Sequence, residues 1–400
     1  MTYLWLALGF VVASAVAGVM FTRVGGSRKS NRTTWAFAAL TFLILAILTA
    51  VFDTLMIAME LFHYDPTQII GVRVGLAPIE DFSYPLACAL LLPPLWLALT
   101  ARRRQHTRTG RHSGLVFQSL LVSRPVSWIN TAYPFAAAML LTTREIDWVL
   151  IVGTIYFLVP YNLAMYGIND VFDYASDLHN PRKGGMEGAL LAPQLHRPLL
   201  WLVAVTNVPF LIVLAGAGGP AVWISLAFTT FMVIAYSAPV LRFKERPVLD
   251  SITSSTHFVN PAIVGFALAG VHITPGLMLL LAAFFLWGMA AHAFGAVQDI
   301  GPDRDAGIAS IATVFGARRT VRLSMAAWTL AGLAMLATPW PGPLVSLIAL
   351  PYLLNAAPWW NVTDSNAADT NRSWRRFIWL NYGSGFLVTL ALILFWRQTS

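Results

Sequence analysis

The chain has 400 residues, of which 57% are hydrophobic and 11% are charged, and its formal net charge at pH 7 is +8. A soluble domain carries about a quarter charged residues, so the composition excludes an ordinary soluble protein. The positive charge could suggest nucleic acid as a partner, but the basic residues cluster between apolar runs, as they do in the cytoplasmic loops of membrane proteins. We therefore expect a membrane protein that binds no nucleic acid.

Apolar runs long enough to cross a bilayer recur along the whole chain. We expect an all-α polytopic membrane protein with about twelve transmembrane helices, the first of them retained because no cleavage site follows it. The predicted spans are residues 2–21, 35–62, 84–101, 126–142, 147–168, 199–217, 221–240, 253–272, 277–298, 321–338, 342–360 and 377–396. The basic loops follow alternate spans, which places them in the cytoplasm and both termini outside.

A polar, basic stretch without aromatic residues, RRRQHTRTGRHSG, separates the third span from the fourth. Such a composition is typical of a linker. We therefore predict an N-terminal unit of about three helices at residues 1–105, a linker at 106–114, and a bundle of about nine helices at 115–400.

Acidic side chains lie at the ends of apolar runs in the N-terminal unit. Asp53 and Glu60 lie near the end of the second span, whereas Glu80 and Asp81 are adjacent at the start of the third. Adjacent carboxyls at an apolar boundary can hold one proton, because burial and a like-charged neighbour both raise a carboxyl pKa. A protonated carboxyl can act as a general acid toward an alkene. An acidic outer loop without chemistry is the alternative.

Two acidic clusters end spans on the basic side of the second unit. In NDVFDYASD, Asp170, Asp173 and Asp177 are spaced i, i+3 and i+7, which places them on one face of a helix. In AVQDIGPDRDAGIAS, Asp299 and Asp303 are four residues apart. A solvated helix end would explain one such cluster, but two clusters at equivalent ends favour a shared ligand.

Carboxylates at one membrane depth repel each other, and a bound cation relieves that repulsion. Hard oxygen ligands favour Mg²⁺, which proteins often hold with a few carboxylates and the phosphates of a substrate. Candidate diphosphate ligands on the same side are Arg182, Lys183, Arg242 and Lys244. Simple topology signalling is the alternative role of these basic residues.

The motifs of the second unit resemble those of the UbiA family of intramembrane prenyltransferases. NDVFDYASD is similar to the family's NDxxDxxxD pattern, DIGPDRD to its second aspartate motif, YSAPVLRFK to its Tyr-Ser-x-Pro and basic stretch, and SRPVSW to the start of its first helix. The resemblance covers roughly residues 115–396. It implies a bundle that binds a prenyl diphosphate through Mg²⁺ held by both aspartate motifs, with Asn169, Tyr236 and Arg124 among the substrate-binding residues. Aromatic candidates for stabilising an allylic cation, named by position only, are Tyr161, Tyr166, Trp287 and Phe294.

The first unit resembles the small membrane lycopene cyclase domain in its FD-x-x-x, LF-x-Y and APIEDF-x-Y-P elements. The resemblance covers roughly residues 1–105. It implies that Glu80 and Asp81 are the candidate acids and that Asp53 is a weaker one. Two such domains act together in that family, so we expect a partner cyclase subunit or a second copy of this chain.

The two resemblances together imply an elongase and cyclase of fifty-carbon carotenoid synthesis, which adds dimethylallyl units from dimethylallyl diphosphate to the ends of lycopene. Three alternatives stay open. The acceptor could be a quinone or a lipid, with the first unit a mere anchor. The chain could be a transporter with an acidic cation pathway, although its acidic residues stop at helix ends. It could also be a scaffold that binds carotenoid or lipid without chemistry.

Overall fold

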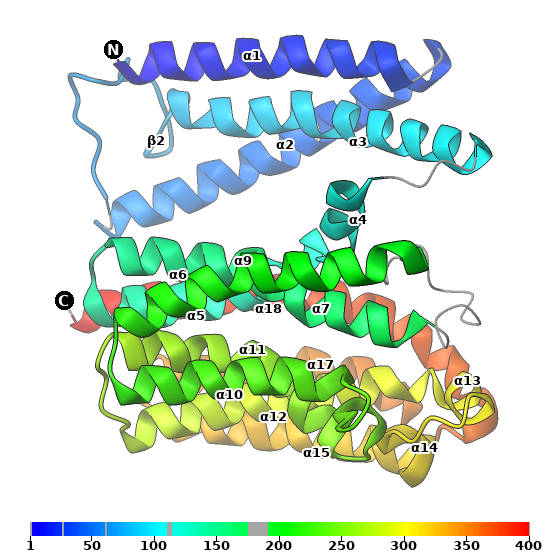
Figure 1. The fold of residues 1–400 in the computed structure, drawn as a ribbon. Coiled ribbons are helices and arrows are strands. Elements are labelled where there is room, and N and C mark those ends of the chain that lie inside the picture. Colours follow the sequence, from blue (N-terminus) through cyan, green and yellow to red (C-terminus); the bar gives the residue numbers. More distant parts are fainter. Residues whose placement is uncertain (1, 26–27, 61, 110–113, 175–190, 400) are drawn as a thin grey trace. The chain divides into compact units, whose positions relative to one another are not determined.

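The structure, a computed structural model, describes residues 2–25, 28–60, 62–109, 114–174 and 191–399 (Figure 1). Asp177, Arg182 and Lys183 lie outside the described residues. The described part is predominantly helical and divides into two compact units, Met1–Ser113 and Gly114–Ser400. The third helix continues to Thr109, past the predicted start of the linker, because Arg and Gln are good helix formers.

The first unit contains three long helices and a small hairpin. Its elements are α1 (Thr2–Gly25), α2 (Arg28–Ala58), β1 (Arg73–Val74), β2 (Ala77–Pro78), η1 (Ile79–Phe82) and α3 (Ser83–Thr109). The two strands are antiparallel, and Arg73 pairs with Pro78. Helix α1 lies along α3 (Figure 1), and a Cβ at Gly18 would come within 2.3 Å of the carbonyl oxygen of Leu90. Gly18 is therefore needed for the close approach of these two helices.

The second unit is a helical bundle. Its elements are α4 (Leu115–Val122), η2 (Pro125–Ser127), α5 (Ile129–Thr143), α6 (Trp148–Leu158), α7 (Pro160–Phe172), η3 (Pro193–Leu195), α9 (His196–Gly216), α10 (Pro220–Ser237), η4 (Phe243–Glu245), α11 (Leu249–Leu268), α12 (Pro275–Val297), α13 (Ile300–Asp305), α14 (Ile311–Phe315), α15 (Ala317–Leu336), α16 (Gly342–Val345), η5 (Ser346–Ile348), α17 (Ala349–Ala356), η6 (Ala357–Trp359), η7 (Asp364–Thr370) and α18 (Asn371–Thr399). Helix α11 packs against α5, α10 and α12, so it lies inside the bundle.

Two main apolar clusters form the core of this bundle. One contains Phe135, Tyr156 and Leu199 from α5, α6 and α9, and the other contains Trp328, Tyr352 and Phe377 from α15, α17 and α18. Helix α11 contributes Val264 to the first cluster and also carries many buried polar residues. The polar interior is therefore concentrated on one central helix.

Within the described ranges, eight helical stretches are long and apolar enough to cross a membrane. They confirm the predicted class, a multi-pass helical membrane protein. The predicted spans 126–142, 253–272, 321–338 and 342–360 are not among these stretches. Helix α5 has only 15 residues, α11 is polar, α15 begins with several arginines, and the last of these spans is broken into short helices. The number of twelve spans therefore stays a prediction.

The fifth predicted span is broken between α6 and α7 at Pro160, which has no backbone N–H to donate. Side chains from α5, α7 and α9 bind the carbonyl groups at this break. The carbonyl oxygen of Phe157 accepts hydrogen bonds from Thr131 Oγ1 at 2.7 Å and from Asn162 Nδ2 at 2.9 Å. The carbonyl oxygen of Pro160 accepts one from Asn207 Nδ2 at 2.9 Å. These bonds hold the direction of α7.

Replacing Asn207 by Leu should lower the free energy of unfolding by about 1–2 kcal/mol, because the buried carbonyl of Pro160 loses its donor. Denaturation of the purified protein in detergent would measure the change. Thr154→Val is the matched control, since Thr154 Oγ1 donates only within its own helix, to the carbonyl of Leu150. Equal stability of the two variants would show that Asn207 does not hold the break.

Candidate functional site

The candidate site lies at the end of the bundle where α7 finishes, and Figure 1 shows α13 and α14 at this same end. Asp170 is in the last turn of α7 and is 1% exposed, and Asp173 is its buried C-cap residue. The C-terminal end of a helix carries a partial negative charge, so carboxylates there are destabilised unless cations lie nearby. The position of the first acidic motif therefore requires positive partners.

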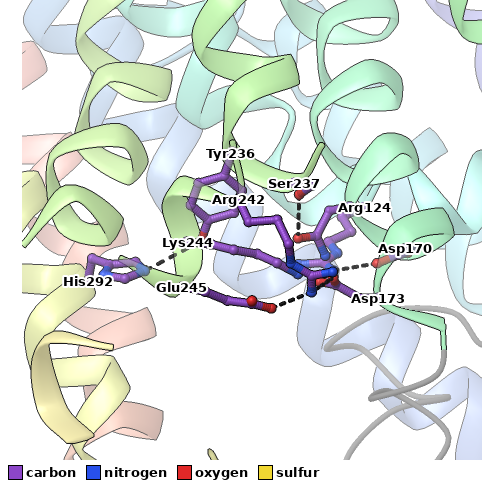
Figure 2. Close-up of polar contacts among 10 residues, drawn as sticks. Arg124, Asp170, Asp173, Tyr236, Ser237, Arg242, Lys244, Glu245 and His292 are labelled. Atoms are coloured by element: carbon purple, nitrogen blue, oxygen red, sulfur yellow. Dashed lines mark hydrogen bonds and ion pairs between the residues drawn. The ribbon is translucent and has the colours of Figure 1, made fainter. Parts of the chain in front are cut away.

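Arg124, in the turn between α4 and η2, supplies the first of these partners. Its Nη2 lies 3.1 Å from Asp170 Oδ1 (Figure 2). Its guanidinium also lies over the ring of Tyr166, 4.2 Å from the ring centroid. The planar guanidinium thus contacts an aromatic face and a carboxylate at once, which a lysine would do less well.

The η4 turn supplies the other two cations. Lys244 Nζ contacts Asp173 Oδ1, and Arg242 Nη2 lies 3.8 Å from the same oxygen. Arg242 also pairs with Glu245 within the turn (Figure 2). Burial lowers the pKa of Lys244 to about 8, whereas the carboxylates of Glu245, Asp170 and Asp303 act to raise it. Asp303 of the second motif therefore lies close enough to interact with a residue that contacts the first.

Both arginines that bind the first motif lie in left-handed backbone, with φ of 50° at Arg124 and 39° at Arg242. Each of them precedes a short 3-10 turn. This conformation is uncommon for residues other than glycine and costs of order 1–3 kcal/mol. The bundle holds both arginines in this left-handed conformation. Each guanidinium is therefore already oriented toward the first motif without a bound ligand.

Because of this strain, Arg124→Gly and Arg124→Ala should differ in stability although both remove the guanidinium. We expect the glycine variant to be more stable by about 1 kcal/mol, since glycine adopts positive φ without a Cβ clash. Denaturation of both proteins in the same detergent would measure the difference. An alanine variant as stable as the glycine variant would contradict the strain.

Polar side chains of α10 connect the first motif to the interior. Ser237 Oγ donates to Asn169 Oδ1 at 3.1 Å. The hydroxyl of Tyr236 lies 3.5 Å from His292 Nε2, and Ser251 Oγ lies 3.1 Å from His292 Nδ1. A polar chain thus runs from the acidic motif of α7 through α10 to α11 and α12.

The second motif follows α12 directly. Asp299 is the N-cap residue of α13 and is half-buried, and Asp303 lies in the first turn of that helix. Arg304 turns away and pairs with Asp364 at 2.8 Å. The structure therefore brings Arg124, Asn169, Asp170, Asp173, Tyr236, Arg242, Lys244 and Asp303 to one end of the bundle.

The aromatic candidates separate into two kinds. Tyr161 and Phe294 are buried in the two apolar clusters, and Trp287 packs against the second cluster. Only Tyr166 lies against a residue of the site, Arg124. Sequence reasoning did not single out Ser237, Glu245, His257 or His292. Histidines inside predicted membrane spans were the signal that could have identified the last two.

The site suits a hard divalent cation. The described residues contain no group of three or more His, Cys, Asp or Glu that could hold a metal. Mg²⁺ does not need such a group, because it is usually bound by one or two carboxylates together with waters and phosphates. The carboxylates of Asp170, Asp173 and Asp303 are oxygen donors of that kind, and the nearby cations could bind phosphate once a metal has taken the carboxylates.

The acidic residues of the first unit form a separate cluster around η1. Glu80 is 7% exposed, and its Oε1 accepts a hydrogen bond from the backbone N–H of Ile70 at 2.6 Å. Asp81 Oδ2 accepts one from the hydroxyl of Tyr64 at 2.6 Å, and Asp81 is also hydrogen-bonded to Asp53. The structure therefore pairs Asp81 with Asp53, whereas the sequence interpretation paired it with Glu80.

Tyr64 completes this cluster. Burial and its hydrogen bond to Asp81 raise the pKa of Tyr64 above its ordinary value. The tyrosine therefore stays protonated near neutral pH and acts as a donor to Asp81. Glu60 is exposed.

A bundle of membrane helices with two aspartate motifs and three cations at one end is the arrangement of an intramembrane prenyltransferase. The chain belongs to the UbiA prenyltransferase family, whose family model matches residues 131–381. Residues 1–97 match the lycopene cyclase family model. Both resemblances seen in the sequence are thus confirmed.

Similar proteins extend over one or both units. The "C(50) beta-cyclic carotenoids biosynthesis protein LbtBC" of Dietzia sp. is 45% identical, with 98% of this chain and 98% of that protein covered. The "Lycopene elongase/hydratase" of Corynebacterium glutamicum is 51% identical over 68% of this chain and 96% of its own length. The solved structure of a UbiA homologue from Archaeoglobus fulgidus bound to GPP and Mg²⁺ has a TM-score of 0.50 and 17% identity, and covers 67% of this chain and 99% of that chain. This last likeness concerns the fold alone.

Proposed function

We propose that the second unit adds dimethylallyl units from dimethylallyl diphosphate to the ends of lycopene, and that the first unit contributes to ring formation, in fifty-carbon carotenoid biosynthesis. The observation that carries the proposal is the end of α7, where buried Asp170 and Asp173 meet Arg124, Arg242 and Lys244. The name of the full-length relative supplies the product class.

Carbon arithmetic supports the choice of donor. Lycopene has forty carbons, and the relative that covers both units is named for carotenoids with fifty. The ten added carbons are two five-carbon units, one for each end of a symmetric acceptor. Dimethylallyl diphosphate is the five-carbon allylic diphosphate that ionises to a stabilised cation, which makes it the donor that we propose.

In this proposal Asp170, Asp173 and Asp303 hold Mg²⁺, together with Asp299 and, outside the described residues, Asp177. The bound ion would neutralise charge on the departing diphosphate. Arg124, Arg242 and Lys244 would bind the diphosphate oxygens, aided by Arg182 and Lys183. Asn169 and Tyr236 would orient the donor. The fixed cations stabilise the negative charge that develops as the allylic C–O bond breaks.

The electron-rich terminal double bond of lycopene then attacks the allylic cation. A carbon–carbon bond forms, and a tertiary cation is left on the acceptor. Loss of a proton or addition of water would end the reaction, whereas ring closure would move the positive charge to another carbon, which then loses a proton. For a ring closure that begins with protonation of a double bond, we propose Asp81 and Glu80 as the acids, with Asp53, which interacts with Asp81, as a weaker candidate. We also propose that a partner cyclase subunit or a second copy of the chain completes this second site.

We further propose that the acidic motifs face the cytoplasm and that both termini lie outside. The basic loops of the sequence support this orientation. It would let a water-soluble diphosphate reach the end of α7 from the cytoplasm while lycopene enters from the bilayer.

The test is mass analysis of the carotenoids in lycopene-producing cells that express this chain alone. Products heavier than lycopene by one and two five-carbon units are expected. Unchanged lycopene, with the folded chain present in the membrane, would contradict elongation by this chain alone and would favour a different acceptor. Retention and absorption of the products would report whether rings form without a partner.

A further inference from the structure

Two buried side chains on α11 each leave one nitrogen without a hydrogen-bond partner in the described part of the chain. His257 is 4% exposed and Asn260 is 3% exposed. His257 Nε2 and Asn260 Nδ2 are both buried, and neither has a hydrogen-bond partner in the described part of the chain. A buried polar atom that is left unsatisfied destabilises the fold. The two residues are three apart on one helix, so their side chains share a face.

Tyr161 orients the ring of His257. The hydroxyl of Tyr161 lies 3.4 Å from His257 Nδ1 and 3.5 Å from the backbone carbonyl oxygen of His257. One arrangement uses both contacts: the hydroxyl donates to the carbonyl and accepts from Nδ1–H. In that tautomer Nε2 has no hydrogen and carries a lone pair. His257 Nε2 is then a buried proton acceptor with no partner.

The other histidine of this region, the half-buried His292 on α12, differs. Both ring nitrogens of His292 have partners, Ser251 Oγ at 3.1 Å and the hydroxyl of Tyr236 at 3.5 Å. Neighbouring side chains thus occupy both ring nitrogens of His292, whereas Nε2 of His257 stays available. This contrast singles out His257 for chemistry.

His257 lies next to the proposed donor site. Its ring packs edge-on against Tyr236, with 5.4 Å between ring centroids. Tyr236 precedes Ser237, which binds Asn169 of the first acidic motif. Seven residues separate His257 from Asp250 near the start of α11, which is a rise of roughly 10 Å along the helix. A diphosphate at the acidic end would direct its hydrocarbon part toward this depth.

We propose that His257 is the base that ends the prenyl transfer. This inference rests on the proposed function. After the acceptor has attacked the allylic cation, its new tertiary cation loses a proton from the neighbouring carbon to His257 Nε2. The C–H electron pair becomes a carbon–carbon double bond, and the imidazole becomes an imidazolium. That proton leaves with the diphosphate, which is basic enough to accept it. Tyr161 is a positioning residue for this step.

The test compares the full-length chain with its variants in lipid vesicles that contain lycopene, supplied with dimethylallyl diphosphate and Mg²⁺ in water enriched in oxygen-18. In His257→Gln the rate of proton loss should fall by about 100-fold, the range of general-base effects. Water should then quench the cation, so the elongated product carries a labelled hydroxyl. Release of diphosphate should stay within a few-fold of the unmodified chain, because the base acts after ionisation.

Two further variants sharpen this test. Tyr161→Phe removes the hydroxyl that orients the ring, and it should shift the product ratio in the same direction by a smaller factor. Ser255→Ala is the matched control, since Ser255 is on the same helix but donates to the carbonyl of Phe285 on α12. It should leave the ratio unchanged.

The outcomes separate this inference from the proposed function. Absence of elongation by the unmodified chain would overturn the proposed function. Elongation with the same ratio of alkene to alcohol in folded His257→Gln and Tyr161→Phe would overturn the role of His257 alone. Loss of diphosphate release in folded His257→Gln would also overturn it, because His257 would then act before the cation exists.

Discussion

Replacing Asp170 by Asn should reduce the transfer of five-carbon units to lycopene by at least about 100-fold, the effect of removing one preorganised electrostatic group from a site. Asp170 is buried, and its partner Arg124 would be left facing a neutral amide. The variant loses one of the oxygen ligands that we propose for Mg²⁺ and keeps the shape of the side chain. The measurement is the rate of diphosphate release together with the mass of the carotenoid products.

The matched control is Asp369→Asn. Asp369 is exposed and pairs only at 3.6 Å with Arg372, three residues away, so its loss should change activity and stability little. Circular dichroism and detergent denaturation would establish that both variants fold. A folded Asp170→Asn protein with more than a tenth of the original activity would rule out the proposed metal and diphosphate site.

Replacing Asp81 by Asn should abolish ring formation and leave elongation unchanged. Asp81 is hydrogen-bonded to Asp53 and Tyr64, and an amide can neither share the proton of that pair nor deliver it to an alkene. Cyclisation does not change mass, so retention and absorption of the products are the measurements. The experiment uses the chain under conditions in which the unmodified protein forms rings, with a partner subunit if one is needed.

Asp65→Asn is the control for this second prediction. Asp65 lies between α2 and β1 and is exposed. It accepts hydrogen bonds from the backbone and side chain of Thr67. Its replacement should affect neither reaction. Glu80→Gln should behave like Asp81→Asn if Glu80 is an acid. If Asp81→Asn lost elongation as well, the division of the two reactions between two sites would be wrong.

The sequence predicted the class of protein and both families, because hydropathy and motif spacing are local properties. The motif NDVFD identified Asp170 and Asp173 without any structure, since helical spacing alone puts them on one face. Arg124 came only from the family resemblance. It lies 46 residues from Asp170 in sequence. The residues around Arg124 therefore do not predict its contact with Asp170.

Other features depended on tertiary structure. The sequence paired Asp81 with its neighbour Glu80, but adjacent residues of a 3-10 turn point in different directions, and the partner of Asp81 comes from α2 instead. The surrounding packing holds Arg124 and Arg242 in left-handed backbone. The sequence does not predict this conformation, because neither position is a glycine. His257 Nε2 can be identified as an atom without a hydrogen-bond partner only when the neighbours of the ring are known from the structure.

The polar character of α11 has a consequence for how the protein is made. Helix α11 contains Asp250, several serines and threonines, His257 and Asn260, and it is absent from the stretches of the described chain that are apolar enough to cross a membrane. Insertion during synthesis depends on the hydrophobicity of each segment, and the polar side chains of α11 oppose it. Helix α11 therefore has to enter the bilayer together with the apolar helices on either side of it, α10 and α12. The polar residues of α11, among them the proposed base His257, therefore also make this helix dependent on its neighbours for membrane integration.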